Sequence, residues 1–235
     1  YAKAFSDDFF LSSGLVSIRF IVEVTLLVGF LSIAIALILN EKFKGSAIVR
    51  VLVIMPWALS EWAVAITGMF FLNSNFGLLN GLLVRSGIIP TNLLWLNEAM
   101  AVEWLSIFFS WNFIPLGAFF ILSALQTIPE DFYKAAKVDG ANAFQRFRNI
   151  TFPFIRYAVL ITLVLSTIEA SRAVVIVLGM TGGGPGNASQ TATFYIFRVF
   201  LRELNLGFGA AMSWIVLLFV LITTVIYFVL LTRRR

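Results

Sequence analysis

A long apolar segment lies near the C-terminus of this chain, where no charged residue occurs between Glu203 and Arg233. An α-helix rises about 1.5 Å per residue, so roughly 20 residues cross the ~30 Å hydrocarbon layer of a membrane. The segment exceeds this length and is apolar almost throughout. We therefore predict a membrane-spanning helix over 208–232.

Four further apolar segments reach a spanning length, although each carries isolated charges or a proline. They cover 15–39, 51–72, 100–125 and 154–178. Of the 235 residues, 60% are hydrophobic and only 12% are charged, whereas a soluble domain carries about 25% charged residues. We expect an all-α, polytopic transmembrane helical bundle with five spans, forming a single transmembrane domain over residues 1–235.

The chain contains neither cysteine nor histidine. Disulfides, thiol nucleophiles, imidazole acids and bases, and most zinc or haem sites are therefore excluded. The net charge is +5, but the basic residues lie between the apolar segments rather than on one face, as nucleic-acid binding would need. The sequence thus favours membrane lipid over nucleic acid as its surroundings, and it predicts no catalytic residue and no metal site.

The distribution of lysine and arginine predicts the orientation, because basic residues accumulate in cytoplasmic connections. One set of alternating connections holds eleven of the 17 basic residues, and the opposite set holds four. The larger set comprises Lys42, Lys44, Arg50, Lys134, Lys137, Arg146, Arg148, Arg156, Arg233, Arg234 and Arg235. We expect the C-terminus in the cytoplasm and Tyr1 outside. An external start without a signal peptide leads us to expect a further span before Tyr1.

The cytoplasmic connection over 126–153 is long and has the pattern of two short helices. Pro129 suits a first helical turn, where Glu130 and Asp131 complement the positive end of the helix dipole. Gly140 then allows the backbone to leave the helix. A face of small and aromatic residues favours docking into a groove of another protein over a solvated linker. That face comprises Phe132, Ala135, Ala136 and Phe144.

The spacing in this connection resembles that of a known family. Binding-protein-dependent ABC importer permeases carry Glu-Ala-Ala, three residues, Gly, nine residues and Ile-x-Leu-Pro, the EAA motif, in a cytoplasmic coupling loop. Ala135 and Ala136, then Gly140, then Ile150–Pro153 stand at the same spacing. Two positions depart from the motif, since Lys134 stands where the family has Glu and Phe152 where it has Leu.

Further stretches are similar to the sugar and glycerol-phosphate branch of that family, the branch of the maltose-type permeases. These stretches are 55–58, 76–80, 123–129 and 181–187. The last of them is rich in glycine and would suit a phosphate cradle, but no Gly-Lys-Ser/Thr follows it. We interpret it as a tight turn that needs positive φ.

The resemblance implies the type I permease fold and a division of labour among subunits. A second permease subunit would complete the pathway as a heterodimer, and two cytoplasmic ABC ATPase subunits would hold ATP and Mg. An extracytoplasmic binding protein would deliver the solute. This chain would lie in a bacterial-type cytoplasmic (inner) membrane and would bind no cofactor itself. The residues expected to couple it to the ATPase are Glu130, Asp131, Lys134, Ala135, Ala136, Asp139, Gly140 and Pro153.

Polar and aromatic residues inside the predicted spans form a candidate solute pathway. A charge near the membrane centre costs about 2.5–3.5 kcal/mol, so it should face protein or a water-filled cavity. Glu169 and Arg172 are three residues apart, so we expect them to pair or to meet a polar solute. Packing between helices is the alternative explanation for each residue. The candidates are Trp57, Glu61, Trp111, Asn112, Glu169 and Arg172.

The sequence therefore predicts a permease subunit of an ATP-driven importer, with a sugar or oligosaccharide as its solute. Glycerol phosphate or another polyol is the second candidate within the same family. A secondary transporter, which would need no ATPase and tends to show inverted repeats, is a further alternative. A noncatalytic membrane scaffold is the last.

Overall fold

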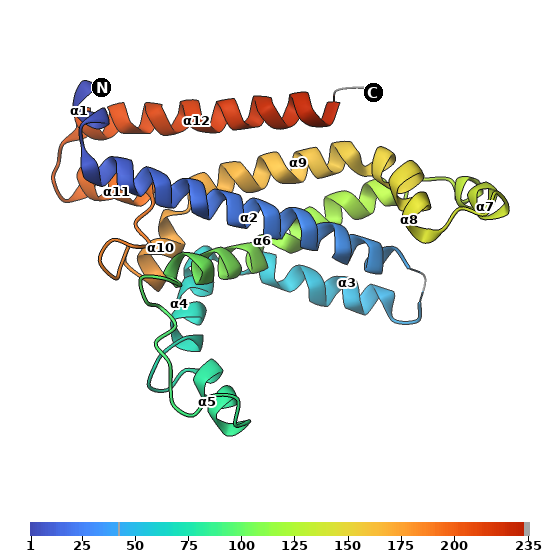
Figure 1. Ribbon diagram of the computed structural model, residues 1–235, viewed down its shortest axis with the longest axis horizontal. Coiled ribbons are helices and arrows are strands. Elements are labelled where there is room, and N and C mark those ends of the chain that lie inside the picture. The colour runs from blue at the N-terminus through green and yellow to red at the C-terminus, as the bar shows by residue number, and fades with distance from the viewer. Residues whose placement is uncertain (42, 233–235) are drawn as a thin grey trace.

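The computed structural model describes residues 1–41 and 43–232, and every regular element in that part of the chain is helical (Figure 1). Lys42, Arg233, Arg234 and Arg235, which contributed to the predicted orientation, lie outside the described residues. The longer helices are α2 (Asp8–Asn40), α6 (Ala101–Leu125), α9 (Phe152–Ser171) and α12 (Leu206–Thr232). The shorter ones are α1 (Ala2–Phe5), α3 (Ser46–Ile54), α4 (Glu61–Phe71), α5 (Leu78–Arg85), α7 (Glu130–Val138), α8 (Ala143–Arg146), α10 (Val174–Met180) and α11 (Ala192–Leu201). A 3-10 helix, η1 (Met55–Ala58), follows α3, and a π-helical segment, η2 (Phe147–Thr151), joins α8 to α9.

Four helices of the described chain are long and apolar enough to cross a membrane. They are α2, α6, α12 and the continuous helix Ala143–Ser171, which consists of α8, η2 and α9. A fifth crossing exists only as a bent pair, Ser46–Ala58 and Glu61–Phe71, whose axes meet at 93°. The all-helical, multi-span architecture predicted from the sequence is confirmed, whereas two of the predicted spans differ in detail.

The predicted span 51–72 is wrong as a single continuous helix. Leu59 and Ser60 both adopt extended backbone, with ψ of 142° and 146°, so the helix stops after η1 and restarts at Glu61. Pro56 lacks an N–H and stiffens the turn ahead of the break. The Ser60 hydroxyl then accepts a hydrogen bond from the Ala63 N–H (3.2 Å) and caps the new helix.

The predicted span 154–178 is also interrupted. Helix α9 ends at Ser171, Arg172 leaves the helical region with φ −100° and ψ 0°, and α10 begins only at Val174. The second short helix predicted within 126–153 does not stand alone, because α8 runs through η2 into α9. The π-helical segment η2 ends just before Phe152 and Pro153, and the helix continues through them into α9.

The core lies where α2 packs along α6 and α9. One cluster of buried apolar residues includes Phe20 of α2 and Phe109 of α6, whose rings meet edge to face with centroids 5.6 Å apart. A second cluster joins Leu39, Ile121 and Ile155 nearer the other end of the bundle. Because the lipid supplies little hydrophobic driving force between helices, this close packing has to hold the spans together.

Polar side chains also join the spans. The Thr25 and Thr167 hydroxyls lie 3.2 Å apart between α2 and α9, and Thr167 donates to the Tyr227 hydroxyl of α12 (3.3 Å). Apart from such contacts α12 lies beside the bundle, and no residue of its most apolar window is buried (Figure 1). The exposed apolar residues of α12 are therefore available to contact lipid or another subunit.

The segment before and within α11 is tied to α2 by polar contacts. The Ala192 N–H donates to the Ser17 hydroxyl (2.7 Å), and the Gln190 amide donates to Ser13 (3.1 Å). The Tyr195 hydroxyl donates to the Asp7 carboxylate (3.2 Å). Burial and the negative charge of Asp7 raise the pKa of Tyr195 to about 12, so the hydroxyl remains a donor at neutral pH.

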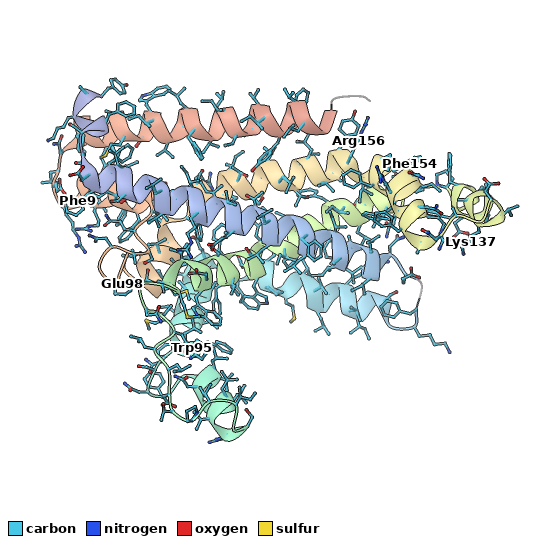
Figure 2. All side chains as sticks on the ribbon, in the orientation of Figure 1. Phe9, Trp95, Glu98, Lys137, Phe154 and Arg156 are labelled. Atoms are coloured by element: carbon cyan, nitrogen blue, oxygen red, sulfur yellow. The ribbon has the colours of Figure 1, made fainter. Side chains whose placement is uncertain are left out.

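The long helices lie along one axis of the molecule, with α1 at one end and α7 at the other (Figure 1). Figure 2 places Phe9 and Lys137 at these opposite ends. Trp95 lies in the arm, which we define as α5 and the loop 86–100 that follows it. Asn80 organises this arm, because its buried amide donates to the Leu93 carbonyl (2.9 Å) and accepts from the Trp95 indole N–H (2.9 Å). The arm projects sideways from the end of the molecule that is opposite α7.

Candidate functional site

A cavity of about 300 Å³ lies beside the break between η1 and α4. Four of the six predicted pathway residues line it, although they come from four separate segments of the chain. These are Trp57, Glu61, Asn112 and Glu169. The remaining lining residues are Phe109, Phe113, Leu116 and Leu165. The predicted residues Trp111 and Arg172 do not line the cavity.

The apolar lining residues were not predicted, but the sequence contains a signal for three of them. Phe109, Phe113 and Leu116 follow the helical spacing of Asn112, so all four occupy one face of α6. Phe109 lies three residues before Asn112 and Leu116 four residues after it, and Phe113 lies four residues after Phe109. Leu165 comes from α9 and has the same spacing relative to Glu169.

Asn112 supports the bend that forms one wall of the cavity. Its side-chain amide donates to the Pro56 carbonyl and, at 3.4 Å, to the Leu59 carbonyl. The Pro56 carbonyl also accepts from the Leu59 N–H (3.2 Å), so Asn112 adds a second donor there and supplies one to the Leu59 carbonyl at the break, where an unpaired carbonyl would be costly in a membrane. The amide N–H groups of Asn112 are therefore used within the protein, and its carbonyl oxygen is the group left for other partners.

Glu61 joins the two interrupted spans. It is the first residue of α4, and its Oε1 accepts from the Ile176 N–H in the first turn of α10 (3.1 Å). A carboxylate at this position also complements the positive ends of both helix dipoles. The two helices pack closely, since a Cβ added at Gly179 would lie 2.8 Å from the Ala65 Cβ.

Glu169 and Arg172 form the ion pair that their spacing predicts. The Arg172 guanidinium donates to Glu169 Oε2 at 3.0 Å, close to the end of α9. Arg172 is the more exposed partner, with 68% of its side chain accessible against 39% for Glu169. Glu169 reaches the cavity, while Arg172 offsets its charge from outside the lining.

Helix α7 and the turn after it, at the end of the molecule opposite α1, hold all the predicted coupling residues except Pro153 (Figure 1). Pro129 precedes the helix in extended conformation, and Glu130 and Asp131 occupy its first turn. The helix ends as predicted at Gly140, whose φ of +77° is favourable only for glycine. The Ala141 N–H donates to the Ala136 carbonyl (2.9 Å), which completes the helix end.

The two faces of α7 have different surroundings. Tyr133, Lys134 and Lys137 line a groove of about 830 Å³ between α7 and the ends of α2 and α6, together with Glu130. Ala135 and Asp139 are exposed on the other side, and Ala136 is half-buried. Lys134, which departs from the family motif, therefore faces this chain's own groove and pairs with Asp131 at 2.9 Å.

Contacts fasten α7 to the base of the α9 helix. The Tyr133 hydroxyl lies 2.9 Å from the Thr151 hydroxyl. The Phe132 and Phe154 rings pack edge to face with centroids 5.6 Å apart, and Figure 2 shows Phe154 at this end of the molecule, near Lys137. Pro153 stands between these two contacts in the first turn of α9.

The glycine-rich stretch 181–187 forms the tight turn predicted for it. Gly182, Gly183 and Gly186 all have positive φ, and so does Asn187. The Ser189 hydroxyl donates to the Gly184 carbonyl (2.6 Å) and closes the turn on itself. The stretch is a structural loop.

Comparisons with known proteins agree on one family. The sequence profile of the family described as "Binding-protein-dependent transport system inner membrane component" matches residues 29–235. The trehalose/maltose transport system permease protein MalF of Thermococcus litoralis is 34% identical over 228 residues, which cover 97% of this chain and 76% of that protein. The sn-glycerol-3-phosphate transport system permease protein UgpA of Agrobacterium fabrum is 31% identical over 240 residues, covering 100% of this chain and 80% of the relative.

The fold has a counterpart among solved structures. A chain in the crystal structure of a bacterial ABC transporter involved in the import of the acidic polysaccharide alginate superposes with a TM-score of 0.84. The two chains are 22% identical, and the match covers 98% of this chain and 81% of that one. At this level of identity the comparison establishes the shared fold.

Proposed function

The chain belongs to the family of binding-protein-dependent transport system inner membrane components, and we propose that it forms half of the translocation pathway for a sugar or oligosaccharide. Membership makes it a multi-pass inner membrane permease of an ABC transporter that works with a binding protein, and not a catalytic subunit. The secondary transporter and the membrane scaffold are thereby removed as alternatives. A second permease subunit, in a heterodimer, completes the proposed pathway.

The observation that supports a sugar is the convergence of Trp57 with Glu61, Asn112 and Glu169 on one cavity. An aromatic face packs against the C–H surface of a sugar ring, while carboxylate and amide oxygens accept hydrogen bonds from its hydroxyl groups. The cavity also adjoins two interrupted spans, and interrupted spans are where membrane transporters commonly bind their solutes. The trehalose/maltose relative is consistent with this assignment.

Replacing Trp57 tests the solute site. We expect Trp57→Ala to lower solute uptake at least tenfold in proteoliposomes that hold the complete transporter and its binding protein, because the aromatic platform is lost. ATP hydrolysis by the ATPase subunits should persist. Trp214→Ala is the matched control, since Trp214 lies on the exposed face of α12 and away from the cavity. Equal uptake by the two variants would remove Trp57 from the pathway.

We place the coupling to the ATPase at α7. Its outward side offers the small side chain of Ala135, which lets the backbone approach a partner closely. Its inner side is fastened to α9 through Tyr133 and Thr151, so a displacement of α7 would be carried toward Glu169 and the cavity. ATP binding would then bias a two-state rearrangement of the spans. In the proposed orientation α7 and the C-terminus lie in the cytoplasm, where two ATPase subunits bind ATP and Mg.

The docking of α7 is tested by purification. Ala135→Trp should abolish co-elution of the ATPase subunits, because the added ring prevents close approach. Ala210→Trp introduces the same bulk on an exposed position of α12 and should leave co-elution unchanged. If the ATPase remains bound to the Ala135 variant, α7 is not the docking element.

Glycerol phosphate, or another polyol, remains the second candidate solute. The observation in its favour is the relative named as a glycerol-3-phosphate permease, which aligns with the whole of this chain. Measuring which solute the cognate binding protein captures decides between the two. A binding protein specific for amino acids or metal ions would contradict both.

A further inference from the structure

The polar lining of the cavity near Trp57 consists largely of hydrogen-bond acceptors. Glu61 and Glu169 each contribute a carboxylate, and an ionised carboxylate can only accept. The N–H groups of Asn112 are engaged by the Pro56 and Leu59 carbonyls, which leaves its oxygen as an acceptor. None of the eight described lining residues is a lysine or an arginine.

Positive charge near the cavity is already matched by carboxylates of this chain. Arg172, which lies outside the lining, is paired with Glu169 at 3.0 Å. The N-terminal turn of α10 donates the Ile176 N–H to Glu61 at 3.1 Å, and Glu61 also stands in the first turn of α4. No uncompensated cation therefore remains in the described lining to receive an anion.

We propose that this cavity selects an uncharged solute rich in hydroxyl groups and rejects phosphorylated or carboxylated solutes. Hydroxyl groups donate hydrogen bonds to the three acceptor groups, whereas an ionised phosphate has only acceptor oxygens to offer. Of the two carboxylates that face the 300 Å³ space, Glu169 is paired with Arg172, whereas Glu61 accepts from a backbone N–H, so the charge of Glu61 in particular repels an anion. The inference rests on the proposed function of the cavity as a solute site, and it chooses between the neutral and anionic solutes left open there.

Trehalose and trehalose 6-phosphate are suitable probes, because they differ only in the charged group. Equilibrium binding of each radiolabelled probe is measured on the purified complete transporter in detergent, without added binding protein. We expect trehalose to bind at least tenfold more tightly than its phosphate. Glu61→Gln and Glu169→Gln should each lower the ratio of trehalose affinity to trehalose 6-phosphate affinity severalfold. The first variant removes a negative charge, and the second also frees Arg172 from its ion pair.

The variants are chosen to separate charge from folding. Gln keeps an oxygen that can accept from the Ile176 N–H, so Glu61→Gln preserves the contact between α4 and α10. Glu103→Gln is the matched control, because Glu103 pairs with Arg19 at the α2–α6 contact and does not line the cavity. It removes one charge from a span and should leave the ratio unchanged.

Three results would overturn the inference. They are tighter or equal binding of trehalose 6-phosphate to the unaltered transporter, a ratio that is unaffected by both cavity variants, and binding of neither probe. Co-elution of the ATPase subunits is followed in the same preparations. Its loss would count against the proposed permease role, while its persistence with failed selectivity would count only against the inferred solute class.

Discussion

At the scale of single residues, small side chains decide how closely the spans approach one another. Gly117 of α6 faces Ser32 of α2 and Thr162 of α9 at the centre of the bundle. A Cβ added at Gly117 would lie 2.5 Å from the Ser32 Oγ and 2.6 Å from the Thr162 Cγ2, well inside normal contact. Glycine is needed at position 117 because Ser32 and Thr162 lie so close. The sequence of α6 alone does not indicate these neighbours.

Enlarging Gly117 should therefore destabilise the bundle. We expect Gly117→Ala to cost about 1–3 kcal/mol, as overpacking of a tight contact does, and Gly117→Leu to cost more. Thermal unfolding of the purified protein in detergent measures the effect. Gly14→Ala is the control, since nothing lies within 4 Å of a Cβ added there. If Gly117→Ala unfolds at the same midpoint temperature as the control, α2 and α9 can move apart enough to accommodate the added methyl group.

The chemical types of the site residues were foreseeable, but their roles were not. The spacing of Glu169 and Arg172 correctly indicated that the two can pair. Nothing in the sequence around Asn112 or Glu61 indicated that they hold the Pro56 carbonyl and the Ile176 N–H. Those partners lie 56 and 115 residues away along the chain. Their proximity depends on where two spans break and restart.

At the scale of elements, turn chemistry was predictable and helix continuity was not. The glycine at the end of α7 was identified from its position in the motif, and its φ of +77° confirms the reason. Proline alone does not mark a helix break, because Pro153 lies within a continuous helix whereas the chain turns by 93° near Pro56. A proline constrains one backbone angle, and the surrounding packing determines whether the helix adjusts or stops.

Substitutions at Gly140 test the turn between α7 and α8. The space around it is open, so only the backbone conformation restricts the residue. Gly140→Val should lower solute transported per ATP several-fold, since a β-branched residue is strained at positive φ and the turn must shift. Gly140→Asn should retain most of the coupling, because asparagine tolerates this conformation better. Equal losses in both variants would point to side-chain bulk instead of backbone geometry.

At the scale of the whole molecule, the proposed solute cavity and the proposed coupling helix α7 lie apart, and long helices connect them. The cavity near Trp57 lies at the broken helices, while α7 lies at one end of the long axis (Figure 1). The helix Ala143–Ser171 runs from beside α7 to Glu169 without interruption. In the proposed mechanism, this helix would carry a displacement of α7 toward the cavity. The exposed apolar face of α12 leaves room for lipid or for another subunit.

The proposed orientation can be tested with single cysteines, because the sequence contains none. Val138 in α7 is 88% exposed and Ile88 beyond α5 is 70% exposed. In right-side-out membrane vesicles, a membrane-impermeant maleimide should label Ile88→Cys and leave Val138→Cys unlabelled until the vesicles are opened. The positive-inside rule predicts this order. The reverse pattern would place α7 outside and rule out its contact with a cytoplasmic ATPase.

The membrane environment, the helical class and the spacing of the proposed coupling motif all follow from the amino-acid sequence alone. These depend on local properties: the length of an apolar run, the lack of charge between Glu203 and Arg233, and the spacing of Ala135, Ala136 and Gly140. Each of these properties depends on residues close together in the chain and on the surrounding solvent. The amino-acid sequence is therefore sufficient to infer them.

Which polar residues line one cavity depends on how the spans pack together. This packing brought Trp57 to Glu169 and left Trp111 and Arg172 outside the cavity, because the breaks after Ala58 and Ser171 redirect the chain. It also turned Lys134 toward this chain's own groove. Both outcomes depend on long-range packing and on the need to satisfy backbone groups freed within the membrane, and no single segment contains that information.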